Sequence, residues 1–339
     1  MPVAAQPHSL VDFAKRVAIA LALVTLALFL WKIAPVLMLG FAGVVIAMVV
    51  RSASDPLTRR LGISQTWAVA IVFTLFILAI LGLAYFFGKQ ITTQTNELWA
   101  AIVDAATKVK GRLDESPLGS FIVGGASGAT DPEALSKMVK GTAFVFGGIA
   151  DVILVLFLAL YLAVDPRSYR NGFLMLMPAA ARDKIGKAID ASGRALRNWL
   201  VGQGVSMLLV GVLTGIGLWL VGVPLAIPLA ILSALLDFVP FVGPLLAAIP
   251  GILVAFSQGP EVAVYAALVY LGVQFLEGNM IMPLVQKWAV ELPPVLGLLS
   301  IVAFGLVFGV MGVLFAMPLT VVAVVLVKRL WIDNEKAPT

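Results

Sequence analysis

Long apolar runs, separated by short polar and often basic loops, dominate this chain of 339 residues. A helix needs about 20 apolar residues to cross the ~30 Å hydrocarbon core of a bilayer. Six runs approach or reach that length and predict membrane helices over residues 17–31, 33–50, 66–87, 143–164, 201–221 and 262–282. Only a short interval separates the first two runs, so we expect two helices joined by a tight break at Lys32–Pro35.

Two further apolar segments, 225–256 and 297–327, are too long for a single crossing. A straight helix of about 32 residues would measure ~48 Å at ~1.5 Å per residue. An internal proline costs a helix about 3 kcal/mol, and a carboxylate at mid-bilayer costs about 2.5–3.5 kcal/mol. We therefore expect both segments to break, either as crossings or as re-entrant hairpins, which charge bias does not separate. The first segment carries one acid and three of the expected helix-breaking prolines: Asp237, Pro240, Pro244 and Pro250.

The composition indicates an integral membrane protein. The chain is 61% apolar and 12% charged, with a mean hydropathy of +1.06, whereas a soluble domain carries about 25% charged residues. We expect an all-α polytopic protein of about eight transmembrane helices, with broken or re-entrant helices in its C-terminal half. The chain has no cysteine, which excludes thiol and disulfide chemistry, and its one histidine, His8, lies in a polar tail. We expect no enzyme activity and no cofactor.

Arginine and lysine set the expected orientation, because they are enriched in cytoplasmic loops. The loop 51–65, the segment 165–200 and the end of the last run are basic and are expected to be cytoplasmic, together with both termini. The segment 89–142 balances its charges and is expected outside the cytoplasm. The net charge of +5 therefore reports topology and does not indicate nucleic-acid binding.

The same reading divides the chain into four parts. Residues 1–88 hold the first three helices, 89–142 form the extracytoplasmic segment, 143–200 hold the fourth helix and a cytoplasmic connector, and 201–330 form a transport core. Within the connector, residues 179–200 place apolar positions between charges. That pattern suits an amphipathic helix on the inner membrane face, or equally a connector that packs on the transmembrane core.

Two strings in the overlong segments share a pattern. Residues 244–255 read PLLAAIPGILVA, and residues 312–323 read GVLFAMPLTVVA. Each string follows a glycine-bearing break, at Gly243 and Gly312, and each contains a proline, Pro250 or Pro318. A true internal repeat would give two related broken units, and paired interruptions of this kind indicate a binding site in transporters.

Polar residues inside the apolar runs gather late in the chain. Gln274 and Glu277 lie three residues apart and share a helical face. Pro283 follows Asn279 by four and would leave the Asn279 carbonyl without its helical donor. Free carbonyls, amides and carboxylates suit a polar solute or a small cation, so we expect a pathway with a possible Na⁺ site at the two acids and no other metal site. The candidate pathway residues are Asp237, Glu277, Asn279, Gln274 and Gln203.

Function is the favoured interpretation for the two acids, because an ionisable group is the most expensive residue to place in hydrocarbon. Asp237 and Glu277 are the groups we expect to exchange protons or bind a cation during transport. For Gln203 and Gln274 the simpler interpretation is a hydrogen bond between helices. Both interpretations stay open at this point.

Five motifs resemble the autoinducer-2 exporter family of bacterial permeases. In chain order they read NWLVGQ, GVLTGIGLWLVGVP, LDFVPFVGPLLAAIP, VQFLEGNMIMPLV and FGVMGVLFAMPL, from Asn198 to Leu319. The N-terminal half is similar only in layout. The resemblance implies eight transmembrane helices, a homo-oligomer such as a pentamer, secondary transport and a place in the bacterial inner (cytoplasmic) membrane. The matching motif positions are Gln203, Asp237, Pro240, Gly243, Pro250, Glu277, Asn279, Pro283, Gly312 and Pro318.

Three functions are compatible with these features. The first is a secondary transporter that exports a small polar solute, of the autoinducer-2 kind, on a proton or sodium gradient. The second is a monovalent cation–proton antiporter, in which Asp237 and Glu277 bind the ion. The third is a membrane scaffold without cargo, whose segment 89–142 binds partners. Position 237 is often asparagine in proteins that resemble this one, so the acid here leaves the cargo and the coupling ion open.

Overall fold

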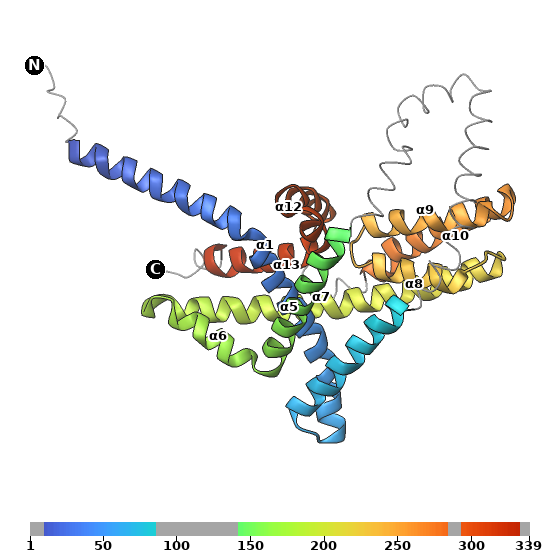
Figure 1. The fold of residues 1–339 in the computed structure, drawn as a ribbon, viewed down its shortest axis with the longest axis horizontal. Coiled ribbons are helices and arrows are strands. Elements are labelled where there is room, and N and C mark those ends of the chain that lie inside the picture. Colours follow the sequence, from blue (N-terminus) through green and yellow to red (C-terminus); the bar gives the residue numbers. More distant parts are fainter. Residues whose placement is uncertain (1–9, 86–141, 284–292, 333–339) are drawn as a thin grey trace, which may run out of the picture.

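The computed structural model describes residues 10–85, 142–283 and 293–332 (Figure 1). Within these ranges every regular element is a helix, which confirms the predicted all-α class. Five of the described helices are long and apolar enough to cross a membrane, and shorter apolar helices accompany them. His8 and almost all of the expected extracytoplasmic segment 89–142 lie outside the described residues.

Helix α1 runs without interruption from Leu10 to Leu61, so the predicted break at Lys32–Pro35 is wrong. At 52 residues this helix is about 78 Å long. Pro35 removes only one backbone hydrogen bond, and apolar helix-forming residues on both sides carry the helix through it. The N-terminal part of α1 projects away from the other helices (Figure 1).

The chain then turns at Gly62, which has a φ of 68°, and returns as a helix over Gln65–Tyr85. Arg51 on α1 donates a 2.8 Å hydrogen bond to the carbonyl oxygen of Ala163, near the end of α5 (Thr142–Val164). A positive charge at a helix C-terminus is favourable, because the free carbonyls there carry partial negative charge. This contact holds α1 and α5 side by side.

Helix α7 spans Ala179–Leu220 and joins the predicted connector to the predicted fifth crossing in one helix of 42 residues. Of the two interpretations of 179–200, the connector packed on the transmembrane core fits and the surface helix does not, because the connector is continuous with a span and its apolar positions pack inward. Short α6 (Pro166–Met175) precedes it and is tied to it by an Arg170–Asp190 ion pair of 2.6 Å. Asp165 caps α6, and hydrogen bonds from Ser168 lower the pKa of its carboxyl.

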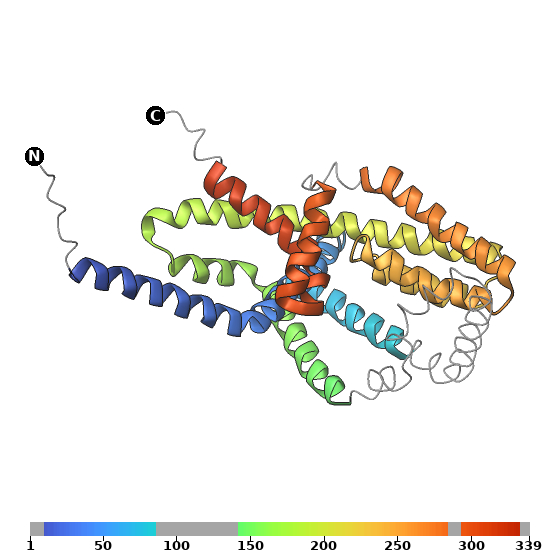
Figure 2. The same cartoon turned by 90° about the horizontal axis from the view of Figure 1, so that it is seen from above.

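The first overlong segment folds back on itself. Helix α8 (Ala226–Leu236) runs back along α7, and α9 (Val242–Phe256) runs back along α8, so that the ends of the segment meet and its break lies at the far tip. At 11 and 15 residues these helices are about 17 and 23 Å long, too short to cross a bilayer. The segment is thus a helical hairpin whose short helices favour re-entry over a crossing, and Figure 2 shows α10 (Pro260–Leu276) lying beside it.

The second overlong segment forms a similar hairpin from α12 (Pro294–Leu314) and α13 (Ala316–Val327). Gly309 interrupts α12 with a φ of 63° and a ψ of −144°. Past this break the chain turns back along α12. Met317 of α13 therefore packs against the start of α12, where a Cβ added at Gly297 would lie 3.2 Å from the Met317 sulfur. Two π-helical turns complete the described helices, η1 (Glu277–Ile281) and η2 (Lys328–Ile332).

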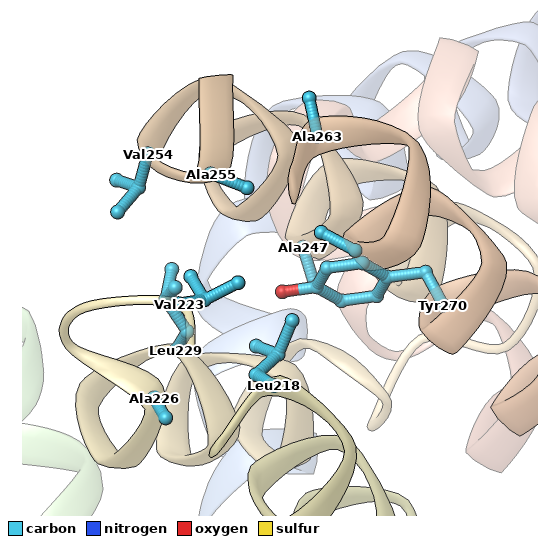
Figure 3. Packing of buried hydrophobic residues seen from close by; sticks show 10 residues of the cluster. Leu218, Val223, Ala226, Leu229, Ala247, Val254, Ala255, Ala263 and Tyr270 are labelled. Carbon is cyan, nitrogen blue, oxygen red and sulfur yellow. The ribbon is translucent and has the colours of Figure 1, made fainter. Parts of the chain in front are cut away.

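Small residues let the first hairpin approach α7 closely. A Cβ atom added at Gly211 would lie 2.8 Å from the Cβ of Ala234, and one at Gly215 would lie 2.9 Å from the Cβ of Ala230. The Gly211/Gly215 pair thus packs α8 within the chain. Behind this contact, apolar side chains of α7, α8, α9 and α10 form one cluster around the ring of Tyr270 (Figure 3).

Both hairpin tips depend on a glycine pressed onto a backbone carbonyl. A Cβ at Gly243 would lie 1.8 Å from the carbonyl oxygen of Leu236, and one at Gly312 would lie 1.9 Å from that of Phe304. Of the predicted helix-breaking prolines, Pro240 lies at the first tip, whereas Pro250 lies inside continuous α9. Pro244 and Pro318 lie in the first turns of α9 and α13, and Pro283 is the last residue described before position 284.

Replacing Gly243 or Gly312 by alanine is expected to destabilise the protein by about 1–3 kcal/mol, because backbone at the tip must move to admit the methyl group. The matched control is Gly272→Ala on α10, where an added Cβ meets nothing within 4 Å. That control should be neutral or stabilising by up to about 1 kcal/mol. Thermal unfolding of the purified protein in detergent measures all three, and equal melting temperatures would contradict the packed tips.

If the segment is re-entrant, Leu220 and Gln258 are expected on one side of the membrane and Lys187, in the third turn of α7, on the other. All three side chains are exposed, and the chain has no native cysteine. In single-cysteine variants, a membrane-impermeant maleimide should label L220C and Q258C from the same side and K187C from the opposite side. Labelling of L220C and Q258C from opposite sides would show that the segment crosses the bilayer.

Candidate functional site

The tip of the first hairpin carries a carboxyl group into the interior. Asp237 ends α8, where its backbone N–H still bonds the carbonyl of Ser233 at 3.0 Å, and its side chain is fully buried. Gln203, halfway along α7, donates from Nε2 to the carbonyl oxygen of Asp237 at 2.7 Å and to its Oδ2 at 3.4 Å. Gln203 therefore satisfies both a carbonyl freed by the break and part of the carboxylate.

A second carboxyl group comes from the end of α10. Glu277 begins the π-helical turn η1 and is 3% exposed. Gln274, one turn earlier on the same face, donates from Nε2 to Glu277 Oε2 at 3.0 Å. Single π-helical turns inside α-helices often mark functional sites, because the extra residue changes where the following side chains point.

The two carboxyl groups meet. Asp237 and Glu277 lie within hydrogen-bonding reach of each other, although 40 positions separate them in the chain. No lysine or arginine in the part of the chain that the structure describes forms an ion pair with either acid. Two buried carboxyl groups in contact repel each other when both are charged, so such a pair shares a proton or holds a cation.

Several polar atoms around the pair have hydrogen-bonding capacity to spare. Asp237 Oδ1 and the hydroxyl of Ser206 face each other but have no hydrogen bond of good geometry within the described ranges. Farther back along α10, the buried hydroxyl of Tyr270 lies in the apolar cluster of Figure 3 against Gly251 of α9, also without a hydrogen bond of good geometry in the described part of the chain. A buried polar group without a partner costs about 1–3 kcal/mol, so this interior is prepared for water or a polar ligand.

Four of the five predicted pathway residues come together. Asn279 does not, because it is exposed and its amide donates to the carbonyl of Phe275 on its own helix at 2.9 Å. Ser206 was missed, although it follows Gln203 by three residues and so shares its helical face. No group of three or more acidic or histidine ligands occurs among the residues described, so any cation here would rely on the two carboxylates and neutral oxygens.

Aromatic rings close the site on one side. Trp199, one turn before Gln203, meets Phe238 edge to face at 6.1 Å between ring centroids, and Phe238 meets Phe315 in the same way at 6.4 Å. Phe315 in turn meets Phe41 of α1 at 6.0 Å. These four rings, from α1, α7 and both hairpins, form an aromatic cluster next to the carboxyl pair.

Comparison with known proteins agrees with these features. Residues 19–331 match the family described as "AI-2E family transporter". The chain is 30% identical over 178 residues to the "Putative transport protein YueF" of Bacillus subtilis, which covers 51% of this chain and 48% of that protein. It is 26% identical over 300 residues to the "Putative permease PerM" of Escherichia coli, covering 82% of this chain and 83% of that protein.

A third relative is the "Putative transport protein MT0215" of Mycobacterium tuberculosis, 33% identical over 175 residues, or 50% of this chain and 47% of that protein. The chain spans about half the length of YueF and MT0215. The family match, in contrast, runs through α1, both hairpins and the carboxyl pair. This multi-pass membrane protein therefore belongs to the AI-2E transporter family.

Proposed function

We propose that the protein is a secondary transporter that exports a small polar solute, and that Gln203, Asp237, Gln274 and Glu277 form its binding station. The observation that carries the proposal is the contact of two buried carboxyl groups, one from a helix break and one from a π-helical turn. Such a contact is expensive in an apolar interior and is retained where it serves transport. A proton or sodium gradient supplies the energy.

The chemistry of the station supports a polar cargo. Two amides and two carboxyl groups offer both donors and acceptors, and the unpartnered Ser206 hydroxyl and Asp237 Oδ1 add further capacity. A solute with several hydroxyl groups would satisfy them. Binding or release of a proton at the carboxyl pair would change its charge and so its affinity for that solute, which couples cargo to ion.

Movement of the first hairpin would give alternating access. Its tip contacts α7 through Gln203 and the second hairpin through Phe238 and Phe315. Separation of the aromatic cluster would open the station toward the arginine-rich end of the bundle, which we take to be cytoplasmic from its charge. Both termini and the basic loops are then cytoplasmic and the membrane is the bacterial inner membrane. The homo-oligomer expected from the sequence stays a prediction.

A monovalent cation–proton antiporter is the second candidate. The adjacent carboxyl groups favour it, because carboxylate oxygens with amide and carbonyl oxygens are suitable ligands for Na⁺. In this case the same pair alternates between a proton and the cation. The two candidates differ in cargo and share the station.

Amide variants at the pair should abolish coupling. D237N and E277Q keep the shape of each side chain and remove its ability to take up a proton or bind a cation. In proteoliposomes with a pH-sensitive dye inside, each variant should lose at least about tenfold in proton-coupled flux, equal to ~1.4 kcal/mol or more of barrier. Flux is followed with Na⁺ outside and, separately, with a polyhydroxylated furanone-type solute.

The matched control is Glu261→Gln, the same chemical change on the exposed first turn of α10. It should keep wild-type flux, while melting temperatures show that all three variants are folded. Flux that is lost for Na⁺ alone would select the antiporter, and flux that is lost for the solute would select the exporter. Unchanged proton coupling in D237N and E277Q would refute the station.

A further inference from the structure

A second hollow lies away from the carboxyl pair, at the end of the bundle where basic residues gather. It has a volume of about 710 Å³ and lies between α1, the α5–α6 junction, α7 and α13. Volumes of this size are typical of sites for small ligands. We call it the arginine cavity, after the residues that line it: Arg51, Arg170, Arg194 and Arg197.

The charges of the arginine cavity are not balanced by its own acids. Arg170 is paired with Asp190, and Arg197 is paired with Asp55 at 2.7 Å. Among the described residues, Arg51 bonds the neutral carbonyl of Ala163 and no acid. Arg194 has no hydrogen-bond or ion-pair partner among the residues that the structure describes. Two guanidinium groups therefore face the hollow without a negative partner.

Two buried hydroxyl groups point to a ligand independently of charge. Ser52 on α1 and Ser192 on α7 both line the cavity, and both hydroxyl oxygens are buried without a hydrogen-bond partner in the described part of the chain. Ser192 is only 5% exposed. Buried hydroxyl groups are normally satisfied, and rotation about χ1 would turn either of these toward a ligand in the hollow.

The rest of the wall is apolar, supplied by Phe41, Val44 and Leu162 on one side and by Val322 and Leu326 on the other. A small hydrophilic anion would make no contact with these apolar side chains. A ligand with an anionic head and a hydrocarbon tail would use the arginines, the hydroxyls and the apolar wall together. Basic pockets between transmembrane helices commonly bind anionic lipid head groups.

The arginine cavity is separate from the transport station. Ser192 and Gln203 lie eleven positions apart on α7, or about 16 Å along the helix. Leu196 and Trp199 are buried between them on the same face, and Trp199 belongs to the aromatic cluster. A molecule in the cavity therefore contacts α7 without touching the carboxyl pair.

We propose that the arginine cavity binds one anionic phospholipid. Its phosphate lies against Arg51 and Arg194 and accepts hydrogen bonds from Ser52 and Ser192, while one acyl chain follows the apolar wall. The lipid joins α1, α5, α7 and α13 at this end of the bundle. It is a resident ligand and not the cargo of the station.

Native mass spectrometry of the full chain, freed of lipid in detergent and titrated with phosphatidylglycerol or phosphatidylcholine, tests the proposal. Wild type should retain one phosphatidylglycerol, at least about tenfold more tightly than phosphatidylcholine. The double variant R51Q/R194Q and the cavity-filling G193L should lose this preference. Gly193 lines the cavity, and a Cβ there meets only Met48 at 3.7 Å, so the remaining atoms of a leucine would extend into the hollow; melting temperatures show that G193L is folded.

Two matched controls should behave as wild type. R60Q removes an exposed positive charge of α1 outside the cavity, and G204L makes the same change as G193L at an open position of α7. Equal retention of phosphatidylglycerol in R51Q/R194Q and R60Q would overturn the proposal. So would displacement of the lipid by soluble glycerol 3-phosphate at equal concentration, which would assign the cavity to a free anion. Loss of transport in G193L with lipid retention unchanged would assign it to the cargo path.

Discussion

A carboxyl group at a helix break, deep among apolar side chains, is the constraint on which the C-terminal half of the structure depends. Asp237 must find partners for its own oxygens and for the carbonyls that the break sets free. Gln203 on α7 donates hydrogen bonds to the Asp237 carbonyl and carboxylate, and Glu277 at the end of α10 contacts the Asp237 carboxyl group. To bring these groups together, α8 must turn back toward the middle of α7, and α10 must end at the same depth. Three features bring the two carboxyl groups together: the first hairpin, its small-residue contact with α7, and the π-helical turn.

The overlong segments and their acid could be predicted from the sequence, because length against bilayer thickness and the cost of a buried carboxylate are properties of composition. Gln203, Gln274 and Glu277 were found for the same reason. The fold-back of 225–256 could not be decided, since charge bias is the same whether both overlong segments cross the bilayer or both are re-entrant. The turn between α8 and α9 depends on contacts such as Gly243 against the Leu236 carbonyl, which appear only in three dimensions.

The wrong predictions have a common cause. Each gave a single residue or a short charged stretch more weight than the helical preference of the longer sequence around it. Pro35 was expected to end a helix, but one missing hydrogen bond is small beside the helical preference of the long apolar stretches around it. Charges in 179–200 suggested a separate surface helix, but its buried positions continue the face of the following span. Asn279 lies apart from the acids because the π-helical turn directs it outward, and its part in a pathway stays a prediction.

The unbroken course of α7 has a mechanical consequence. Lys184 holds α7 near its start by a hydrogen bond to the carbonyl of Leu330, Arg197 holds it farther along by its ion pair with Asp55, and Gln203 holds the hairpin tip. Only six positions, about 9 Å, separate Arg197 from Gln203. A straight helix transmits tilt and rotation with little loss over such a distance. Salt, lipid or a protein that changes the contacts of the charged part of α7 would thus also shift the position of the first hairpin.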